Sequence, residues 1–264
     1  MAIDKIKLAV YLDEVDDDPA TACKNLATKG IHYVVLRNAW MGNICDATDT
    51  ACQRLRQLLN DNSLSVVTIA SDLGRFDHLS AVPPAKVDRL FNLAAYFQAA
   101  NVRVHIGNHI RGGPDMVQIK NWMTMITDRC LSAGLTPLLE VSDDSAVRDP
   151  VQLAGLLAAF RRWKLLYDPA QLIIKHKQDP FQRYWTLLKS FVGAVDLRDF
   201  KIGHGFKPVG FGDARLRETV GEGLSGQFKG WYYLEPSLGR KHGSAVTRWE
   251  TFQLAHEALE NLVS

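Results

Sequence analysis

Two glutamates each end a short, strand-like apolar segment. Glu140 closes the segment 136–140 (TPLLE), and Glu235 closes the segment 231–235 (WYYLE). A carboxylate at the end of an apolar strand costs too much free energy to bury without a partner, so such a group usually faces a cation, a base or a substrate. We expect the two glutamates to share one site.

Two aspartates hold comparable positions between those glutamates. Asp168 follows a short apolar segment at 164–167, and Asp196 lies in the segment 193–199 (GAVDLRD). Four acidic groups on successive strands would suit a hard cation such as Mg²⁺ or Mn²⁺ if the strands converge. Asp168 before a proline could instead only open a turn. Alternation along the strand does not decide whether Asp196 or Asp199 points inward.

Eight candidate strands recur along the chain, and segments with helical periodicity lie between them. Two of these helical segments have clear start signals, at Pro83-Pro84 and Asp149-Pro150. Alternating strands and helices imply parallel strands joined by right-handed crossovers. The candidate strands span residues 6–13, 32–37, 65–71, 102–107, 136–142, 164–172, 192–201 and 230–235.

Eight such units without an intervening linker favour closure into a barrel over a doubly wound open sheet. We therefore predict an α/β protein with a single (β/α)₈ TIM barrel domain over residues 1–264. In that architecture the active site lies at the C-terminal ends of the strands, where all four carboxylates fall.

The composition of the chain indicates an ordered protein and excludes some kinds of partner. The chain has 264 residues, 47% of them hydrophobic, and a net charge of +2, which favours neither disorder nor a strongly charged partner. Its basic residues are scattered, so we expect no nucleic acid partner. No apolar run approaches the roughly 20 residues that span a bilayer, so we expect no membrane association.

Cysteine spacing and the N-terminal residues bear on the compartment. The four cysteines lack metal-type CxxC spacing, and the first residues lack the pattern of a signal peptide. We therefore expect a cytoplasmic protein. Cys45 and Cys52 are close enough in sequence to pair, but we expect free thiols in a reducing compartment.

From about Gly30 onward, the chain resembles the xylose isomerase-like TIM barrels, a superfamily that holds sugar (phosphate) isomerases and epimerases and also endonuclease IV. The segment 195–199 (VDLRD) looks like the family's Val-His-Leu-Lys-Asp strand. The segment 208–213 (PVGFGD) is similar to its Pro-x-Gly-x-Gly-x turn, and 226–231 (GQFKGW) then leads to Glu235.

The resemblance implies a set of roles for the acidic residues. Glu140, Asp168, Asp196 and Glu235 would correspond to four metal ligands, with Glu140 and Glu235 also serving as the acid/base pair. The implied cofactor is a divalent metal, Mn²⁺ or Mg²⁺, with Zn²⁺ or Co²⁺ as alternatives. The implied function lies in carbohydrate metabolism: an isomerase or epimerase in which two glutamates move a proton next to the carbonyl group of a sugar or sugar phosphate.

The chain departs from the family pattern at three positions. Asp196 stands where epimerases usually carry histidine, Gln171 stands where a histidine often follows, and Val35 replaces a common glutamate. Aspartate is still an oxygen ligand and shifts the metal preference toward Mg²⁺ or Mn²⁺. Four negative charges nevertheless need more than one divalent ion, so a basic neighbour such as Arg198 or Lys201 must contribute.

These departures leave two alternative functions open. If a basic side chain takes the ion's place, the protein is a metal-free barrel that binds a sugar or polyol without catalysis. An endonuclease IV-like phosphodiesterase requires a multi-zinc site rich in histidines, and Gln171 and Asp196 each remove an expected imidazole.

Six further side chains lie at strand ends where a small-molecule sugar or sugar phosphate could bind. The histidines could instead be hydrogen-bonded structural residues, and the tryptophan could pack on the rim of its own barrel. A homo-oligomer also stays open. The six residues are His105, His109, Trp40, Arg198, Lys201 and His204.

Overall fold

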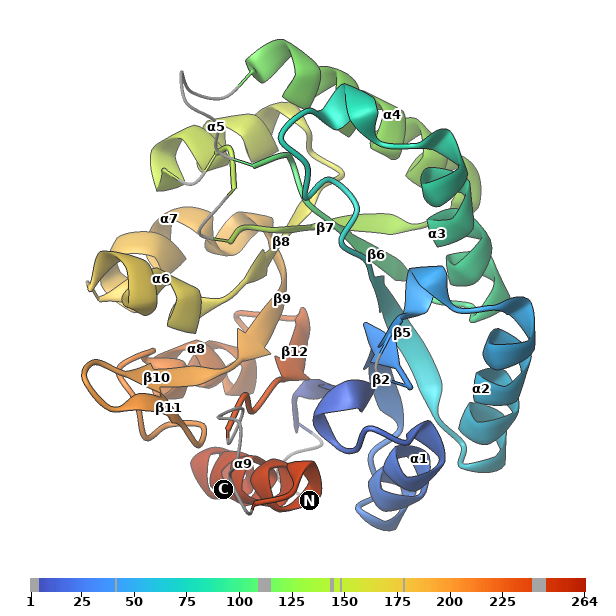
Figure 1. Ribbon diagram of the computed structural model, residues 1–264. Coiled ribbons are helices and arrows are strands. Elements are labelled where there is room, and N and C mark those ends of the chain that lie inside the picture. The colour runs from blue at the N-terminus through green and yellow to red at the C-terminus, as the bar shows by residue number, and fades with distance from the viewer. Residues whose placement is uncertain are drawn as a thin grey trace.

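Eight parallel strands form a closed barrel in the computed structural model, which describes residues 5–40, 42–108, 115–142, 145–147, 149–177, 179–238 and 246–264 (Figure 1). The ring order is β1-β12-β9-β8-β7-β6-β5-β2. This closure confirms the predicted (β/α)₈ architecture. The strands are β1 (Lys7–Tyr11), β2 (Tyr33–Leu36), β5 (Ser65–Ala70), β6 (Asn101–Val104), β7 (Thr136–Glu140), β8 (Lys164–Tyr167), β9 (Val192–Leu197) and β12 (Trp231–Leu234).

Helices surround the barrel on its outside (Figure 1). The α-helices are α1 (Pro19–Thr28), α2 (Asp49–Asp61), α3 (Pro84–Tyr96), α4 (Met116–Ala133), α5 (Pro150–Ala159), α6 (Pro169–His176), α7 (Thr186–Leu188), α8 (Leu216–Leu224) and α9 (Arg248–Val263). The expected start signals operate, since Asp149 accepts hydrogen bonds from the backbone of Val151 and Gln152 at the start of α5. Thr247 and Glu250 form a reciprocal capping box at the start of α9.

Short elements decorate the ends of the barrel. Two antiparallel hairpins join β3 (Asn38–Ala39) to β4 (Gly42–Asn43) and β10 (Asp199–Lys201) to β11 (Gly205–Lys207). Short helical turns complete the described part of the chain: η2 (Leu12–Glu14), η3 (Ile44–Asp46), η4 (Leu79–Ala81), η5 (Phe181–Trp185) and η6 (Lys189–Phe191).

Apolar side chains fill the barrel interior, so it is a packed core and not a pore. The two largest are Tyr11 and Tyr233, which meet edge to face with ring centroids 6.0 Å apart. The Tyr233 hydroxyl lies 2.6 Å from the Thr68 hydroxyl. The interior cluster consists of Ala9, Tyr11, Val35, Val67, Ala70, Leu138, Leu166, Ala194 and Tyr233. Val35 is therefore a core residue of the lumen.

The barrel strands are shorter than the predicted ranges, and the difference is largest for β8 and β9. The strand expected over 164–172 ends at Tyr167, because Asp168 caps α6 by accepting a hydrogen bond from the Gln171 backbone and Pro169 takes the first helical position. The strand expected over 192–201 divides at Arg198, between β9 and β10.

The cysteines and helix lengths bear on two further expectations. All four cysteines are free thiols, Cys45 and Cys52 included. Among the described residues, no helix combines the length and the apolar character that crossing a membrane would require.

Candidate active site

The four acidic residues singled out in the sequence lie at one mouth of the barrel. Glu140 is the last residue of β7, and Asp168 and Glu235 directly follow β8 and β12. Asp196 is the fifth residue of β9, and its side chain is buried. Parallel strands present their C-terminal ends on the same side, so the fold brings these residues from four adjacent strands together.

Arg37, which follows β2, links three acidic residues across the mouth. Its Nη1 donates to Glu235 Oε1 at 2.6 Å, and its Nη2 donates to Asp13 Oδ2 at 2.9 Å and to Glu14 Oε1 at 2.8 Å. Its guanidinium carbon also lies 4.6 Å from the centre of the Tyr11 ring. Asp13 and Glu14 belong to η2, directly after β1, so this network joins three neighbouring strands.

Arg103 on β6 pairs with Glu140. The distance between Arg103 Nη1 and Glu140 Oε2 is 2.8 Å. Burial opposes ionisation of Glu140, but the positive charges of Arg103 and its neighbours outweigh burial and lower the pKa of Glu140 to about 2. The His105 Nε2 lies 3.8 Å from the same carboxylate oxygen. Burial lowers the pKa of His105 to about 4, so its ring is neutral at pH 7.

Arg198 lies between two acidic residues. It forms an ion pair with Asp168, and its Nη1 is 3.6 Å from Glu235 Oε1. Burial opposes ionisation of Glu235, but Arg198 and Arg37 together lower the pKa of that carboxyl group. Both Glu140 and Glu235 are therefore ionised at neutral pH.

Asp196 has a different environment, since no described basic side chain forms an ion pair with it. It accepts a hydrogen bond from the Tyr11 hydroxyl at 3.2 Å. Burial raises the pKa of Asp196 well above its usual value, and the negative charges of Glu235 and Asp168 add to that effect. Asp196 thus favours its protonated form at the inner surface of the mouth.

Asp199 points away from the mouth and into the loop after β11. Its carboxylate accepts hydrogen bonds from the backbone N–H groups of Gly210 and Gly212, both at 2.9 Å, and of Ala214, at 3.1 Å. A side chain at Gly212 would meet the Asp199 carboxylate, because an added Cβ would lie 2.2 Å from Oδ1. The choice that sequence alternation left open is settled in favour of Asp196 as the inward residue.

The acidic residues at the mouth do not fit the divalent ion that the sequence predicts. Arginine side chains already neutralise Glu140, Asp168 and Glu235, and the environment of Asp196 favours its neutral form. With the arginines in place, no three acidic, histidine or cysteine side chains within the described ranges come together closely enough to hold a metal ion. A metal ligand must be ionised and free of a competing cation, and none of these four side chains meets both conditions.

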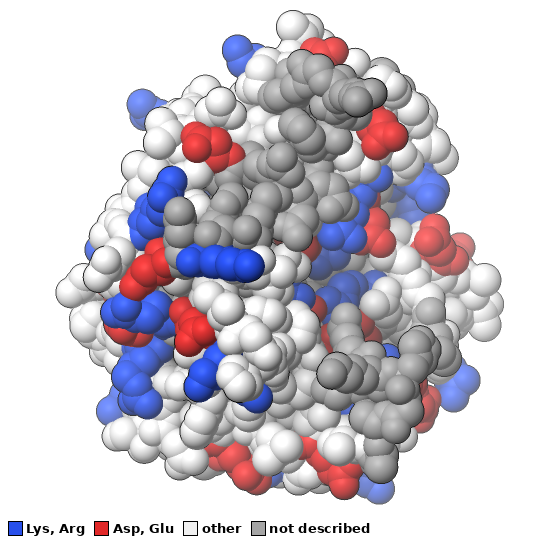
Figure 2. Space-filling view, turned by 60° about the vertical axis from the view of Figure 1, so that its left-hand side comes forward, with Lys and Arg blue, Asp and Glu red and all other residues white. Residues whose placement is uncertain are grey.

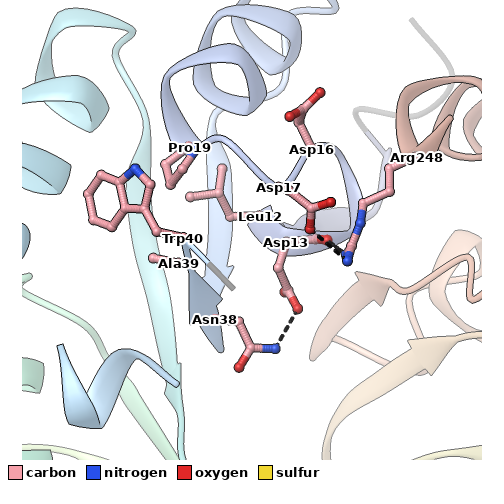
Figure 3. Close-up of a pocket in the computed structure, with 9 residues that line it drawn as sticks. All are labelled: Leu12, Asp13, Asp16, Asp17, Pro19, Asn38, Ala39, Trp40 and Arg248. Atoms are coloured by element: carbon pink, nitrogen blue, oxygen red, sulfur yellow. Dashed lines mark hydrogen bonds and ion pairs between the residues drawn. The ribbon is translucent and has the colours of Figure 1, made fainter. Parts of the chain in front are cut away.

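A cavity of about 170 Å³ opens beside Asp13, at the ends of β1 and β2 (Figure 3). The Asn38 side chain donates a hydrogen bond to Asp13 Oδ2 at 2.8 Å, and Arg248 pairs with Asp17 at 2.7 Å. Trp40 forms part of the cavity wall with a backbone φ of 48°. Trp40, one of the residues predicted to bind a sugar, therefore lies beside this cavity.

The remaining predicted substrate-binding residues occupy different surroundings. His105 is buried beside Glu140, whereas Lys201 and His204 are exposed in the hairpin formed by β10 and β11. The structure therefore does not bring Lys201 and His204 into the ion-pair network. His109 lies outside the described residues.

Sequence reasoning missed two of the three arginines and the acidic pair of η2. Arg37 ends an apolar strand in the same way as the predicted acids, which is a signal that could have identified it. Arg103 stands between two buried valines in β6, and a lone charge inside a short apolar strand is a second such signal. Asp13 is the last residue of the strand predicted over 6–13, so it carries the same strand-end signal as the predicted acids.

Charges of both signs are interleaved on the face seen in Figure 2, without a large area of either sign. This distribution agrees with the small net charge of the chain, +2. The charges at the mouth therefore act through local pairs and not through a field that covers the whole face.

Solved structures of similar fold cover nearly the whole chain. A xylose isomerase domain-containing protein from Salmonella typhimurium has a TM-score of 0.76 and 16% identity over 100% of both chains. A xylose isomerase-like TIM barrel protein from Mycobacterium smegmatis, in complex with magnesium, has a TM-score of 0.72 and 15% identity over 99% of this chain and 98% of that one. A D-allulose 3-epimerase from Methylomonas has a TM-score of 0.65 and 14% identity, covering 97% and 96% of the two chains.

No family model matches the chain, and neither does any curated protein. Identities this low support a statement about fold and not about activity. The chain has the (β/α)₈ barrel fold of the xylose isomerase-like TIM barrels.

Proposed function

We propose that the C-terminal mouth of the barrel binds a sugar or sugar phosphate, and that Glu140 and Glu235 transfer a proton at a carbon next to its carbonyl group. The observation that carries this proposal is a pair of glutamates at the ends of separate strands, each beside an arginine that favours its ionised form. Two strands, β8 and β9, separate β7 from β12 in the ring, so the two carboxylates approach the mouth from different sides. An isomerase or epimerase needs this arrangement, because one group removes the proton and the other returns it.

The neighbouring arginines supply the electrostatic part of the reaction. Removal of the proton leaves negative charge on the carbonyl oxygen of the substrate. Arg103 and Arg198 each keep a buried Nε that has no hydrogen-bond partner among the described residues. Donors held in a buried site stabilise a developing oxyanion more strongly than water does. The divalent ion implied by the family resemblance is not part of this proposal, because arginines already neutralise the carboxylates.

Glu140 requires a change in its surroundings before it can act as a base. A group with a pKa of about 2 is a weak base at neutral pH, because proton transfer is most efficient when the pKa lies near the working pH. A substrate oxygen that takes over part of the Arg103 guanidinium would loosen the ion pair with Glu140. The basicity of Glu140 would then rise only when substrate is bound.

The second candidate function is a barrel that binds a sugar or polyol without catalysis. The ion pair between Glu140 and Arg103 favours it, because this pair stabilises the charged form of Glu140 and so makes it a weaker base. Both candidates place the ligand at the same mouth. They differ in whether bound ligand exchanges a proton with solvent.

A deuterium-exchange screen over ketoses, aldoses and their phosphates separates the two candidates. We expect the unmodified protein to exchange the carbonyl-adjacent proton of at least one compound. Glu140→Gln and Glu235→Gln should each lower that rate by about 10²–10⁴-fold, because glutamine keeps the shape but cannot take the proton. Glu257→Gln, an exposed change on α9, is the matched control and should leave the rate unchanged. Full exchange by both site variants would remove these glutamates from the mechanism, and binding without exchange would favour the second candidate.

A further inference from the structure

We propose that Arg198 is the resident cation of this site, and that its guanidinium takes the place of the divalent ion that the family resemblance implies. Arg198 directly follows β9 and contacts acidic residues that follow the two adjacent strands, Asp168 after β8 and Glu235 after β12. One positive group bridging carboxylates from separate strands is the electrostatic role of a metal ion.

The guanidinium is held in position on its other side as well. Its central carbon lies 5.6 Å from the centre of the Phe206 ring, on β11. Phe206 packs edge to face against Phe200 of β10, with ring centroids 5.4 Å apart. Asp199 anchors the loop after β11 through its backbone hydrogen bonds to Gly210 and Gly212. The side chain of Arg198 is therefore buried between a fixed hairpin and the carboxylates, with 11% of its surface exposed.

Arg198 also keeps a donor for a ligand. Its buried Nε has no hydrogen-bond partner among the described residues, whereas its two terminal nitrogens face Asp168 and Glu235. This free donor can bind a substrate oxygen and stabilise negative charge on it. That last role rests on the proposed proton-transfer function, but the replacement of a metal ion by Arg198 does not.

Two consequences distinguish an arginine from a metal ion. A guanidinium keeps its charge at any accessible pH and cannot be removed by a chelator. The Arg198 guanidinium also prevents an added ion from binding to the carboxylates. Its removal leaves Asp168 and Glu235 buried without that positive partner. A buried carboxylate in this position gains from any cation that can reach it.

Direct measurement of Mn²⁺ binding tests the inference. The purified full-length protein is dialysed against a chelator and titrated with Mn²⁺ alone, with bound ion followed by electron paramagnetic resonance and stability by thermal unfolding. We expect the unmodified protein to bind no Mn²⁺ at the mouth and to keep its melting temperature. Arg198→Ala should gain Mn²⁺ binding, with an affinity at least about tenfold above the upper limit measured for the unmodified protein, and its melting temperature should rise with added Mn²⁺.

Two further variants complete the Mn²⁺ titration. Arg129→Ala removes an exposed arginine that pairs with Asp88, and it should gain no Mn²⁺ binding. Arg198→Gln is used if the alanine variant does not fold, because it keeps a polar side chain while removing the charge. Stoichiometric Mn²⁺ binding by the unmodified protein would overturn the inference. So would a folded Arg198 variant that binds Mn²⁺ no better than the unmodified protein.

The exchange assay separates this inference from the proposed function. If the unmodified protein exchanges a sugar proton, chelator treatment should leave the rate unchanged, and a loss that Mn²⁺ restores would overturn the inference. If no compound is exchanged at all, the proposed catalytic function fails. The Mn²⁺ titration then still decides whether Arg198 is the resident cation.

Discussion

The buried acidic residues at the mouth have different partners, and these partners give them different protonation states. Glu140 has Arg103 and Glu235 has both Arg37 and Arg198, so both carboxylates are ionised. Asp196 has only the Tyr11 hydroxyl as a described side-chain hydrogen-bond donor, and its pKa is raised. Neighbouring titratable groups whose pKa values are pushed apart are the usual basis for separate acid and base roles.

Asp196→Asn should stabilise the protein at neutral pH. Near pH 3 the aspartate is protonated in both states and affects stability little. As the pH rises above about 3.9, the unfolded chain releases this proton while the folded protein retains it, so the aspartate lowers the free energy of unfolding. Asparagine stays neutral and can still accept from Tyr11. The gain should be about 1.4 kcal/mol for each pKa unit of the shift.

Urea unfolding of both proteins between pH 3 and pH 8 measures this difference. The gain from asparagine should grow with rising pH and disappear near the acidic end. A variant that is equally or less stable at pH 7 would show that the aspartate is ionised and stabilised in the folded protein.

At the scale of strands and helices, sequence patterns predicted the elements that depend on interactions between residues close in the chain. Apolar segments between turn signals located all eight strands, and Asp149-Pro150 located the start of α5. The end of β8 was missed, because the capping of α6 by Asp168 competes with extension of the strand. The acids at strand ends could be predicted. Their pairing could not, since Arg37 and Glu235 are 198 positions apart in the chain and meet only when the barrel closes.

Two glycines with positive φ allow a matched test of close backbone approach. Gly74, with φ of +88°, lies where an added Cβ would be 2.1 Å from the carbonyl oxygen of His105. Gly134, with φ of +68°, ends α4 and has no heavy atom within 4 Å of such a Cβ. Gly134→Ala should cost about 1–2 kcal/mol for the left-handed backbone alone. Gly74→Ala should cost clearly more, because the backbone that carries His105 must also move.

Chemical denaturation of the two alanine variants gives both free energies of unfolding. Equal losses would mean that the loop around Gly74 relaxes freely. In that case the backbone hydrogen bonds of this loop, from His105 to Leu73 at 2.8 Å and from Gly107 to Gly74 at 2.7 Å, would not hold the segment in place.

At the scale of the whole molecule, closure of the ring depends on contacts between the two ends of the chain. β1 pairs with β12 on one side and with β2 on the other, so the first strand completes the barrel. Arg37 spans the same three strand ends through Asp13, Glu14 and Glu235. The network at the mouth therefore also links the strands that close the barrel.

Arg37→Met should destabilise the barrel strongly, because it removes the charge but keeps much of the side-chain volume. Loss of one partner from a buried ion pair typically costs about 3–5 kcal/mol, since the remaining carboxylates stay buried without compensation. Arg129→Met breaks an exposed pair with Asp88 and should cost about 0–1 kcal/mol. Adding Glu235→Gln to Arg37→Met should recover part of the loss, because it removes one of the uncompensated charges. Equilibrium unfolding of the three variants measures these losses of stability. An Arg37→Met variant no less stable than Arg129→Met would show that the Arg37 ion pairs do not stabilise the closed barrel.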